Sequence, residues 1–147
     1  MEIGQNITDY ERRSTVERLF AASGIAAIVG GVSVVAHFDP SASHFFPVCP
    51  LYALTGIACP GCGLTRGYHA LFHGDIATAL HFNALIPLYS LIFGYLFISL
   101  MLLAVRGRGL SFSVFRKPWL LWSVAILAIA FAVLRNLPIY PFNLLYP

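Results

Sequence analysis

Long apolar runs alternate with short polar segments along this chain, and three of the runs are long enough to cross a bilayer. They cover residues 19–38, 84–105 and 118–135. A helix needs about 20 predominantly apolar residues to cross the hydrocarbon core. The third run is shorter, but Arg135 at its end can extend its side chain toward the headgroups. The pattern therefore predicts three transmembrane helices.

The segment between the first two runs, residues 39–83, predicts shorter elements. Its two early prolines, Pro47 and Pro50, predict an extended chain around them. Further on, the composition predicts two short helices that are each apolar on one side, so we expect them to lie at the membrane interface. The predicted fold class is therefore an all-α integral membrane protein, with three transmembrane helices and an interfacial helical hairpin between the first and second.

The bounds of that hairpin follow from its capping residues. Residues 64–72 have good helical composition, and Gly74 then predicts the end of the first short helix. Asp75 is a favourable N-cap and predicts a second helix over residues 76–82.

The first transmembrane run is preceded by a polar, mixed-charge segment, residues 1–18, which we expect to be an arm ahead of an uncleaved anchor rather than a signal peptide. Ser14 and Glu17 fit a capping box, so the first helix is predicted to begin there. The run itself carries small residues that allow close approach of a second helix. These residues are Ser23, Gly24, Gly30, Gly31 and Ser33.

Composition narrows the class of protein. The chain has 147 residues, of which 59% are hydrophobic and 10% charged, whereas soluble domains carry about 25% charged residues. So much apolar surface cannot be buried inside a globule of this size, which indicates one membrane domain over residues 1–147. The net charge of +3 is too small to indicate nucleic-acid binding.

The basic residues indicate an orientation. Residues 1–18 and the loop 106–117 are basic, whereas the segment 39–83 holds one arginine. Positive loops stay in the cytoplasm, so we predict a cytoplasmic N-terminus in a bacterial inner membrane. The segment 39–83 and the tail 136–147 are then exoplasmic. The basic residues in question are Arg12, Arg13, Arg18, Arg106, Arg108, Arg116 and Lys117.

All three cysteines lie in one short segment, at Cys49, Cys59 and Cys62. Cys59 and Cys62 form a C-x-x-C followed by glycine, as in one zinc knuckle. Cys49 and a histidine would complete four ligands. His69 and His73 are spaced i, i+4 and therefore share a helix face. One interpretation is thus a zinc site formed by three cysteines and a histidine.

Two other interpretations of the thiols remain open. On the exoplasmic side thiols oxidise, and Cys49 could close a loop onto Cys59 or Cys62. The third cysteine would then be free, bonded to a partner or in exchange with the pair. Redox turnover is the other, because the dipole at a helix start favours the thiolate of Cys62. A thioredoxin-like site needs a domain of its own, however. We predict the disulfide, with zinc as the alternative.

The residues around the thiols are expected to be structural. Gly61 and Gly63 are predicted to adopt backbone conformations that a side chain would strain. Arg66 is expected to contact helix-end carbonyls or Asp75. The patch lacks a carboxylate pair and a serine–base arrangement, so we predict that the protein is not an enzyme.

The motif in this segment resembles a known family. The residues that carry the resemblance are Cys49-Pro50, the run Leu54 to Arg66 with its CPGCGLTR core, Gly74-Asp75, Ala79 and Asn83. They are similar to the bacterial membrane-protein family called domain of unknown function two thousand seven hundred and fifty-two. The resemblance implies a small multi-pass inner-membrane protein with a cysteine-bearing hairpin, and implies no activity. The asparagine-proline usual in that family is Asn83-Ala84 here.

Two classes of function compete on this basis. The first is an accessory or structural subunit that docks into a larger membrane assembly through residues 19–38 and the cysteine hairpin, which we prefer. The second is an autonomous metal-binding or thiol-redox membrane protein that uses Cys49, Cys59 and Cys62. The predicted partners are the lipid bilayer and other membrane subunits, with no nucleic acid. No cofactor is expected, and zinc is the metal that the thiols could hold.

Overall fold

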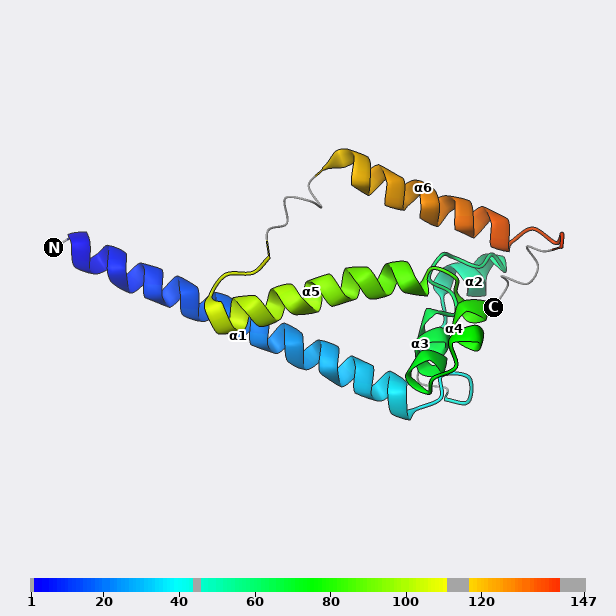
Figure 1. The fold of residues 1–147 in the computed structure, drawn as a ribbon, viewed down its shortest axis with the longest axis horizontal. Helices are drawn as coiled ribbons and strands as arrows, with labels where there is room; N and C mark the ends of the chain where they lie inside the picture. Colours follow the sequence, from blue (N-terminus) through cyan, green and yellow to red (C-terminus); the bar gives the residue numbers. More distant parts are fainter. Residues whose placement is uncertain (1, 44–45, 111–116, 141–147) are drawn as a thin grey trace. The chain divides into compact units, whose positions relative to one another are not determined.

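The computed structural model describes residues 2–43, 46–110 and 117–140, with side chains from residue 15 onward. All secondary structure in these ranges is helical, as Figure 1 shows. The helices in chain order are α1 (Glu2–His37), α2 (Pro50–Thr55), α3 (Leu64–Phe72), α4 (Ile76–Phe82), α5 (Ile86–Arg106) and α6 (Pro118–Arg135). The predicted all-α class is confirmed.

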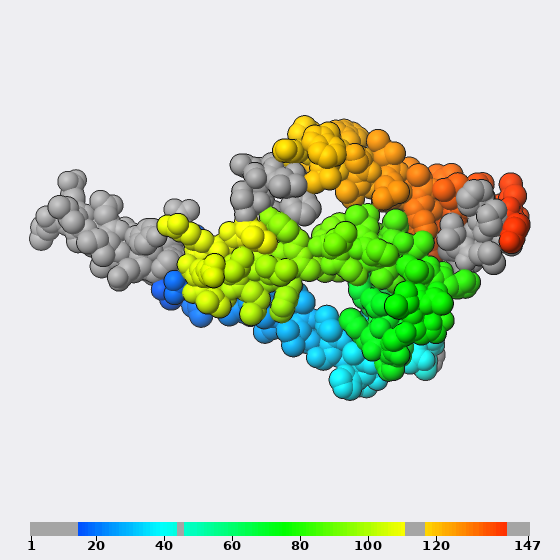
Figure 2. Space-filling model, viewed as in Figure 1, coloured from blue at the N-terminus to red at the C-terminus, as the bar shows by residue number. Residues whose placement is uncertain are grey.

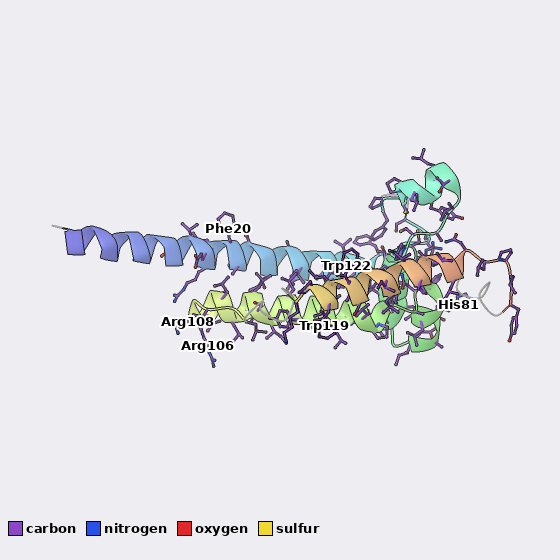
Figure 3. The ribbon with its side chains drawn as sticks, turned by 90° about the horizontal axis from the view of Figure 1, so that it is seen from above. Phe20, His81, Arg106, Arg108, Trp119 and Trp122 are labelled. Carbon is purple, nitrogen blue, oxygen red and sulfur yellow. The ribbon has the colours of Figure 1, made fainter. Side chains whose placement is uncertain are left out.

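Three of these helices are long and apolar enough to cross a membrane. The spans are Thr15–His37 in α1, Ile86–Arg106 in α5 and Pro118–Arg135 in α6. Their large apolar side chains are mostly exposed, which is the arrangement expected when lipid covers them. Trp119 and Trp122, at the start of α6, point outward from the helix (Figure 3). Tryptophans at such a position are typical of the membrane–water interface.

The start of the first helix differs from the prediction. Helix α1 begins at Glu2 and runs without interruption through Ser14, which therefore caps no helix end. Residues 2–13 contain no proline and include glutamate, glutamine and arginine. These residues favour helix, so nothing local stops the helix from extending past the capping-box sequence.

The chain around Pro50 also differs from the prediction of an extended segment. Pro50 is the first residue of α2, which ends at Gly56 in the left-handed conformation, with φ 70°. Proline is favourable at the first helical position, because its missing N–H would be unpaired there anyway and its φ is already helical.

The chain divides into two compact units. The helix-pair unit comprises Met1–Val32 and Leu91–Ser111, and the hairpin unit comprises Ser33–Ser90 and Phe112–Pro147. In the helix-pair unit, α1 approaches α5 at one of the predicted small residues. A Cβ at Gly24 would lie 3.3 Å from the Leu100 side chain. A Cβ at Gly30 or Gly31 would meet no atom within 4 Å.

The hairpin unit contains the predicted pair of short helices with the predicted bounds. Helices α3 and α4 pack on each other, and their side chains form one continuous green surface in Figure 2. Gly74 between them has φ 83°, and the Asp75 carboxylate accepts a hydrogen bond from the Thr78 N–H at 2.9 Å. Gly67 of α3 is buried, and a Cβ there would lie 3.0 Å from the Ala79 carbonyl oxygen. Glycine at this position therefore permits the close approach of the two helices.

Candidate thiol and metal site

The thiol loop, residues 58–63, connects α2 to α3 as a tight turn. The Cys62 N–H donates to the Cys59 carbonyl at 3.0 Å, and the Cys59 N–H donates to the Cys62 sulfur at 3.2 Å. Gly63 then begins α3 with φ 77°, a left-handed conformation that favours glycine. Two hydrogen bonds between Cys59 and Cys62 therefore close the turn, and one of them directs a backbone N–H at the Cys62 sulfur.

This turn brings all three thiols together. The Cys59 sulfur lies 3.4 Å from the Cys49 sulfur and 3.3 Å from the Cys62 sulfur. All three sulfurs lie within 4.8 Å of one another. Cys62 is buried, whereas Cys49, just before α2, and Cys59 are half-buried. Two of the three thiols are therefore partly accessible.

A fully buried arginine from a distant helix holds the thiol loop. Arg135 is the last residue of α6, and its side chain is 0% exposed. One terminal guanidinium nitrogen donates to the carbonyls of Cys59 and Cys62, each at 3.0 Å, and the other donates to the Phe82 carbonyl at 3.4 Å. Burying a guanidinium is costly unless hydrogen bonds compensate it, and these carbonyls provide them.

Two asparagines complete the support of the loop. Asn83 is also 0% exposed, and its amide nitrogen donates to the carbonyls of Pro60 at 2.8 Å and Cys62 at 3.1 Å. Asn136 binds the Ala58 backbone on both sides, accepting from its N–H and donating to its carbonyl, each at 2.9 Å. The amide oxygen of Asn83 also accepts from the Leu85 N–H at 2.9 Å, so both amides have their oxygen and nitrogen paired, which fixes the loop in one conformation.

The thiols differ in acidity. The pKa of Cys49 is lowered to about 7, first by the backbone N–H of Tyr52 and then by the Cys59 thiol. The pKa of Cys62 is raised to about 12, chiefly because burial disfavours its charged form. Without a bound ion, Cys49 is therefore the more reactive of these two thiols at neutral pH.

The two predicted histidine ligands lie outside the cluster. The Nδ1 atom of His69 is 2.7 Å from the Val35 carbonyl oxygen, and the Nδ1 atom of His73 is 2.9 Å from the His69 carbonyl oxygen. Among the residues with described side chains, the metal-ligating group at this place consists of the three cysteines alone.

The other predicted structural residues have separate roles. The Arg66 guanidinium lies over the Phe82 ring, 5.3 Å from its centroid, whereas the predicted partners were helix-end carbonyls or Asp75. Asp75 caps α4, and the hydrogen bonds from Thr78 lower the pKa of its carboxyl. Gly61 lacks the positive φ that Gly63 has, so the predicted backbone requirement holds at Gly63 only.

The residues that hold the loop were not expected from the sequence. Arg135 was expected to extend its side chain toward the headgroups at the end of a span, and Asn83 was named only as a residue of the family motif. The one available signal was the Arg135-Asn136 pair directly after an apolar run. The three cysteines are free thiols in the structure, and the disulfide between Cys49 and Cys59 or Cys62 stays a prediction.

Comparison with known proteins identifies the segment that carries the site. Residues 49–97 match the family described as "Protein of unknown function (DUF2752)". The match begins at Cys49, includes the thiol loop and Asn83, and ends within α5. It confirms the resemblance expected from the CPGCGLTR motif. No curated protein and no solved structure matches the chain.

Proposed function

We propose that this membrane protein, whose residues 49–97 match DUF2752, binds a metal ion through the thiolates of Cys49, Cys59 and Cys62. The observation that carries the proposal is the convergence of the three sulfurs within 4.8 Å on a loop held by buried polar side chains. Cysteines at this separation are the ligand set of structural zinc and related thiolate sites.

The sulfur separations suit a central ion. A metal–sulfur bond is about 2.3 Å long, so two sulfurs on one ion lie roughly 3.8 Å apart at tetrahedral angles. The observed separations of 3.4 and 3.3 Å are a few tenths of an ångström shorter. Such a change is available to side-chain rotation without moving the loop backbone.

Two contacts of the thiol loop offset part of the effect of burial, which raises the pKa of Cys62. The Cys59 N–H donates to the Cys62 sulfur, and a hydrogen bond to the charged form lowers its cost. The Arg135 guanidinium binds the carbonyls of Cys59 and Cys62, which places a positive charge next to the cluster. Outer contacts of this kind orient metal ligands and tune the affinity.

The site would lie on the exoplasmic side of a bacterial inner membrane. This orientation rests on the basic residues near the N-terminus and in the loop after α5, which would be cytoplasmic. The side chains of Arg106 and Arg108 extend away from the end of α5 (Figure 3), as expected of residues in contact with headgroups. Three crossings would then put the thiol loop on the opposite side.

Metal analysis tests the proposed function. The full chain is purified in mild detergent under reducing conditions, and metal content per chain is measured by mass spectrometry. We expect about one ion per chain in the wild type and a loss of most of it in Cys49→Ser. His73→Gln is the matched control and should retain the ion. Metal-free wild-type protein that also fails to take up added ions would refute the proposal.

A second candidate function is an accessory subunit of a larger membrane assembly. The observation that favours it is the uncovered small-residue surface of α1, where a Cβ at Gly30 or Gly31 would meet no atom within 4 Å. Small residues allow a second helix to approach closely. Gly30→Ile should release a partner that co-purifies with the wild type, whereas Gly94→Ile, also open on α5, is the control. A wild-type protein that purifies alone would contradict this role.

A further inference from the structure

We infer that the three-thiol site takes a monovalent soft ion of the copper(I) class, held in three-coordinate geometry by sulfur alone. This inference rests on the proposed function and specifies which kind of ion the site selects. The ligand set is Cys49, Cys59 and Cys62. Its support is that His69, His73 and Asp75 lie outside the group of ligand atoms around the sulfurs, and that the carbonyls of the thiol loop accept hydrogen bonds from the protein.

The two histidines predicted as ligands of a zinc site lie outside the group of ligand atoms around the sulfurs. His69 contacts the Val35 carbonyl at 2.7 Å, and His73 contacts the His69 carbonyl at 2.9 Å. These contacts orient the two rings toward backbone oxygens, and both lie outside the group of ligand atoms around the sulfurs. The described side chains thus supply no fourth nitrogen ligand.

The carboxylate on this hairpin is also engaged. Asp75 caps α4 by accepting from the Thr78 N–H, at the far end of α3 from the thiol loop. It is not a member of the group of ligand atoms around the sulfurs. A carboxylate oxygen is therefore not brought to the site by the described residues.

The carbonyl oxygens of the thiol loop already accept hydrogen bonds from other groups of the protein. The Cys59 and Cys62 carbonyls accept from Arg135, and the Pro60 and Cys62 carbonyls accept from Asn83. The Gly61 carbonyl accepts from the Leu64 N–H at 3.1 Å. Oxygen ligands for a harder cation would require breaking these hydrogen bonds, four of which come from the fully buried side chains of Arg135 and Asn83.

A donor set of sulfur alone selects the ion. Thiolates are soft ligands and select copper(I), zinc and iron–sulfur clusters, whereas magnesium and calcium take oxygen. Zinc in structural sites is almost always four-coordinate, so three sulfurs would leave its fourth position to a water molecule or another ligand from outside the cluster. Among these ions, copper(I) is the one for which a set of three thiolates is complete.

Binding changes the charge in a defined way. One copper(I) ion displaces the protons of three thiols, forming three copper–sulfur bonds and releasing three protons, with no change in oxidation state. The resulting complex carries two negative charges. The Arg135 guanidinium donates hydrogen bonds to the carbonyls of Cys59 and Cys62, and its positive charge offsets part of the negative charge of the complex. Arg135 is therefore a positioning residue for the ion rather than a ligand.

Competition between ions provides the test. Reduced, metal-free full-length protein in detergent is titrated with copper(I) buffered by bathocuproine disulfonate, and separately with Zn²⁺ buffered by a chromophoric chelator. X-ray absorption of each loaded sample then gives the ligand number and type. We expect one copper(I) per chain with three sulfur neighbours, and displacement of zinc by copper(I). The results that would refute the proposed metal binding differ from those that would refute only the choice of copper(I).

If zinc binds with three sulfurs and a nitrogen or oxygen and resists copper(I), this inference is wrong, and metal binding by the thiols stands. If copper(I) binds with a nitrogen neighbour, the sulfur-only set is wrong. If neither ion binds, both proposals fall. Three sulfur neighbours around copper(I), together with displacement of zinc, support both.

Substitutions at the cysteines and at the nearby histidines distinguish residues that bind the ion from residues that only lie near it. Cys49→Ser changes a half-buried thiol and should weaken copper(I) binding by more than the roughly 10–100-fold that outer-contact changes cost. The double variant His69→Gln with His73→Gln should bind as the wild type does, and weaker binding there would overturn the inference. Cys62→Ser alters a buried residue and can prevent folding, so Cys49→Ser gives the deciding result.

Arg135 is tested with two substitutions. Arg135→Lys keeps the charge but loses the forked donor, and we expect weaker copper(I) binding by about 10–100-fold. Arg66→Lys, on the half-exposed guanidinium over Phe82, is the matched control. A changed X-ray absorption edge in Arg135→Lys at full copper occupancy would show an effect on the ion itself, which loss of fold alone would not produce. Unchanged affinity and spectrum would overturn the positioning role.

Discussion

At the scale of single residues, buried Arg135 connects the end of α6 to the thiol loop and to α4 within the hairpin unit. It is 0% exposed and donates to three carbonyls from two different segments. A buried carbonyl left without a donor costs about 1–3 kcal/mol. The side chain also stacks on Phe131, with 5.0 Å between the guanidinium carbon and the ring centroid. The loss of this residue therefore affects the loop and the end of α6 together.

Removing the arginine side chain should destabilise the protein. Arg135→Met leaves the carbonyls of Cys59, Cys62 and Phe82 without this donor, and we expect a loss of at least about 1–3 kcal/mol in unfolding free energy. Thermal unfolding in detergent measures it. Arg66→Met removes a cation–π contact worth about 0.5–1 kcal/mol at exposed sites and serves as the control. Equal destabilisation by both changes would contradict the role of Arg135.

The acidity of the thiols predicts a pH-dependent reactivity. Because the pKa of Cys49 is lowered from 9.0 to about 7, its thiolate fraction should rise as pH increases through neutrality. The pKa of Cys62 is raised from 9.0 to about 12, so its thiol should stay protonated over that range. Iodoacetamide labelling of reduced, metal-free protein at several pH values, with peptide mapping, should show Cys49 modified first. Faster labelling of Cys62 than of Cys49 near pH 7 would contradict this order of the two pKa values.

At the scale of elements, the glycines of the thiol loop separate into two kinds. Gly63 has φ 77° at the start of α3, whereas Gly61 has no positive φ, and a Cβ at Gly61 would lie 3.8 Å from the Cys59 sulfur. A left-handed conformation costs a residue with a side chain roughly 1–2 kcal/mol. An added methyl group at Gly61 meets only ordinary van der Waals contact.

Alanine at the two glycines should therefore have unequal effects. Gly63→Ala should lower unfolding free energy by roughly 1–2 kcal/mol and reduce the amount of protein in the membrane. Gly61→Ala is the neighbouring control and should be close to neutral. Membrane abundance and thermal unfolding of both variants give the comparison. The reverse order would mean that the start of α3 does not constrain the loop.

The short helices were predictable because their signals are local. Asp75 as an N-cap and Gly74 as a helix end lie within a few residues of the backbone groups that they satisfy. Proline at the start of α2 and the continuation of α1 through Ser14 were predicted wrongly. In both cases the same local sequence is compatible with two backbone conformations.

At the scale of the whole molecule, the positive residues predict which side of the membrane carries the thiols. We expect a membrane-impermeant maleimide, applied to intact cells after mild reduction, to label Cys49, because this thiol is half-buried rather than enclosed. Arg108→Cys, made at an exposed position in a protein that also carries Cys49→Ser, should be labelled at residue 108 only after permeabilisation. Labelling with the opposite dependence would reverse the orientation.

The sequence by itself determined the membrane class, the three spanning runs, the two short helices and the clustering of the thiols along the chain. Hydrophobic length, capping residues and C-x-x-C spacing act within a few residues and need no knowledge of the fold. The tertiary structure alone decided what surrounds the thiols. Arg135 binds Cys59 across 76 positions of sequence and Asn136 binds Ala58 across 78, whereas His69 turns to the Val35 carbonyl. Such partners depend on how helices pack, and packing brings together residues whose local patterns contain no information about one another.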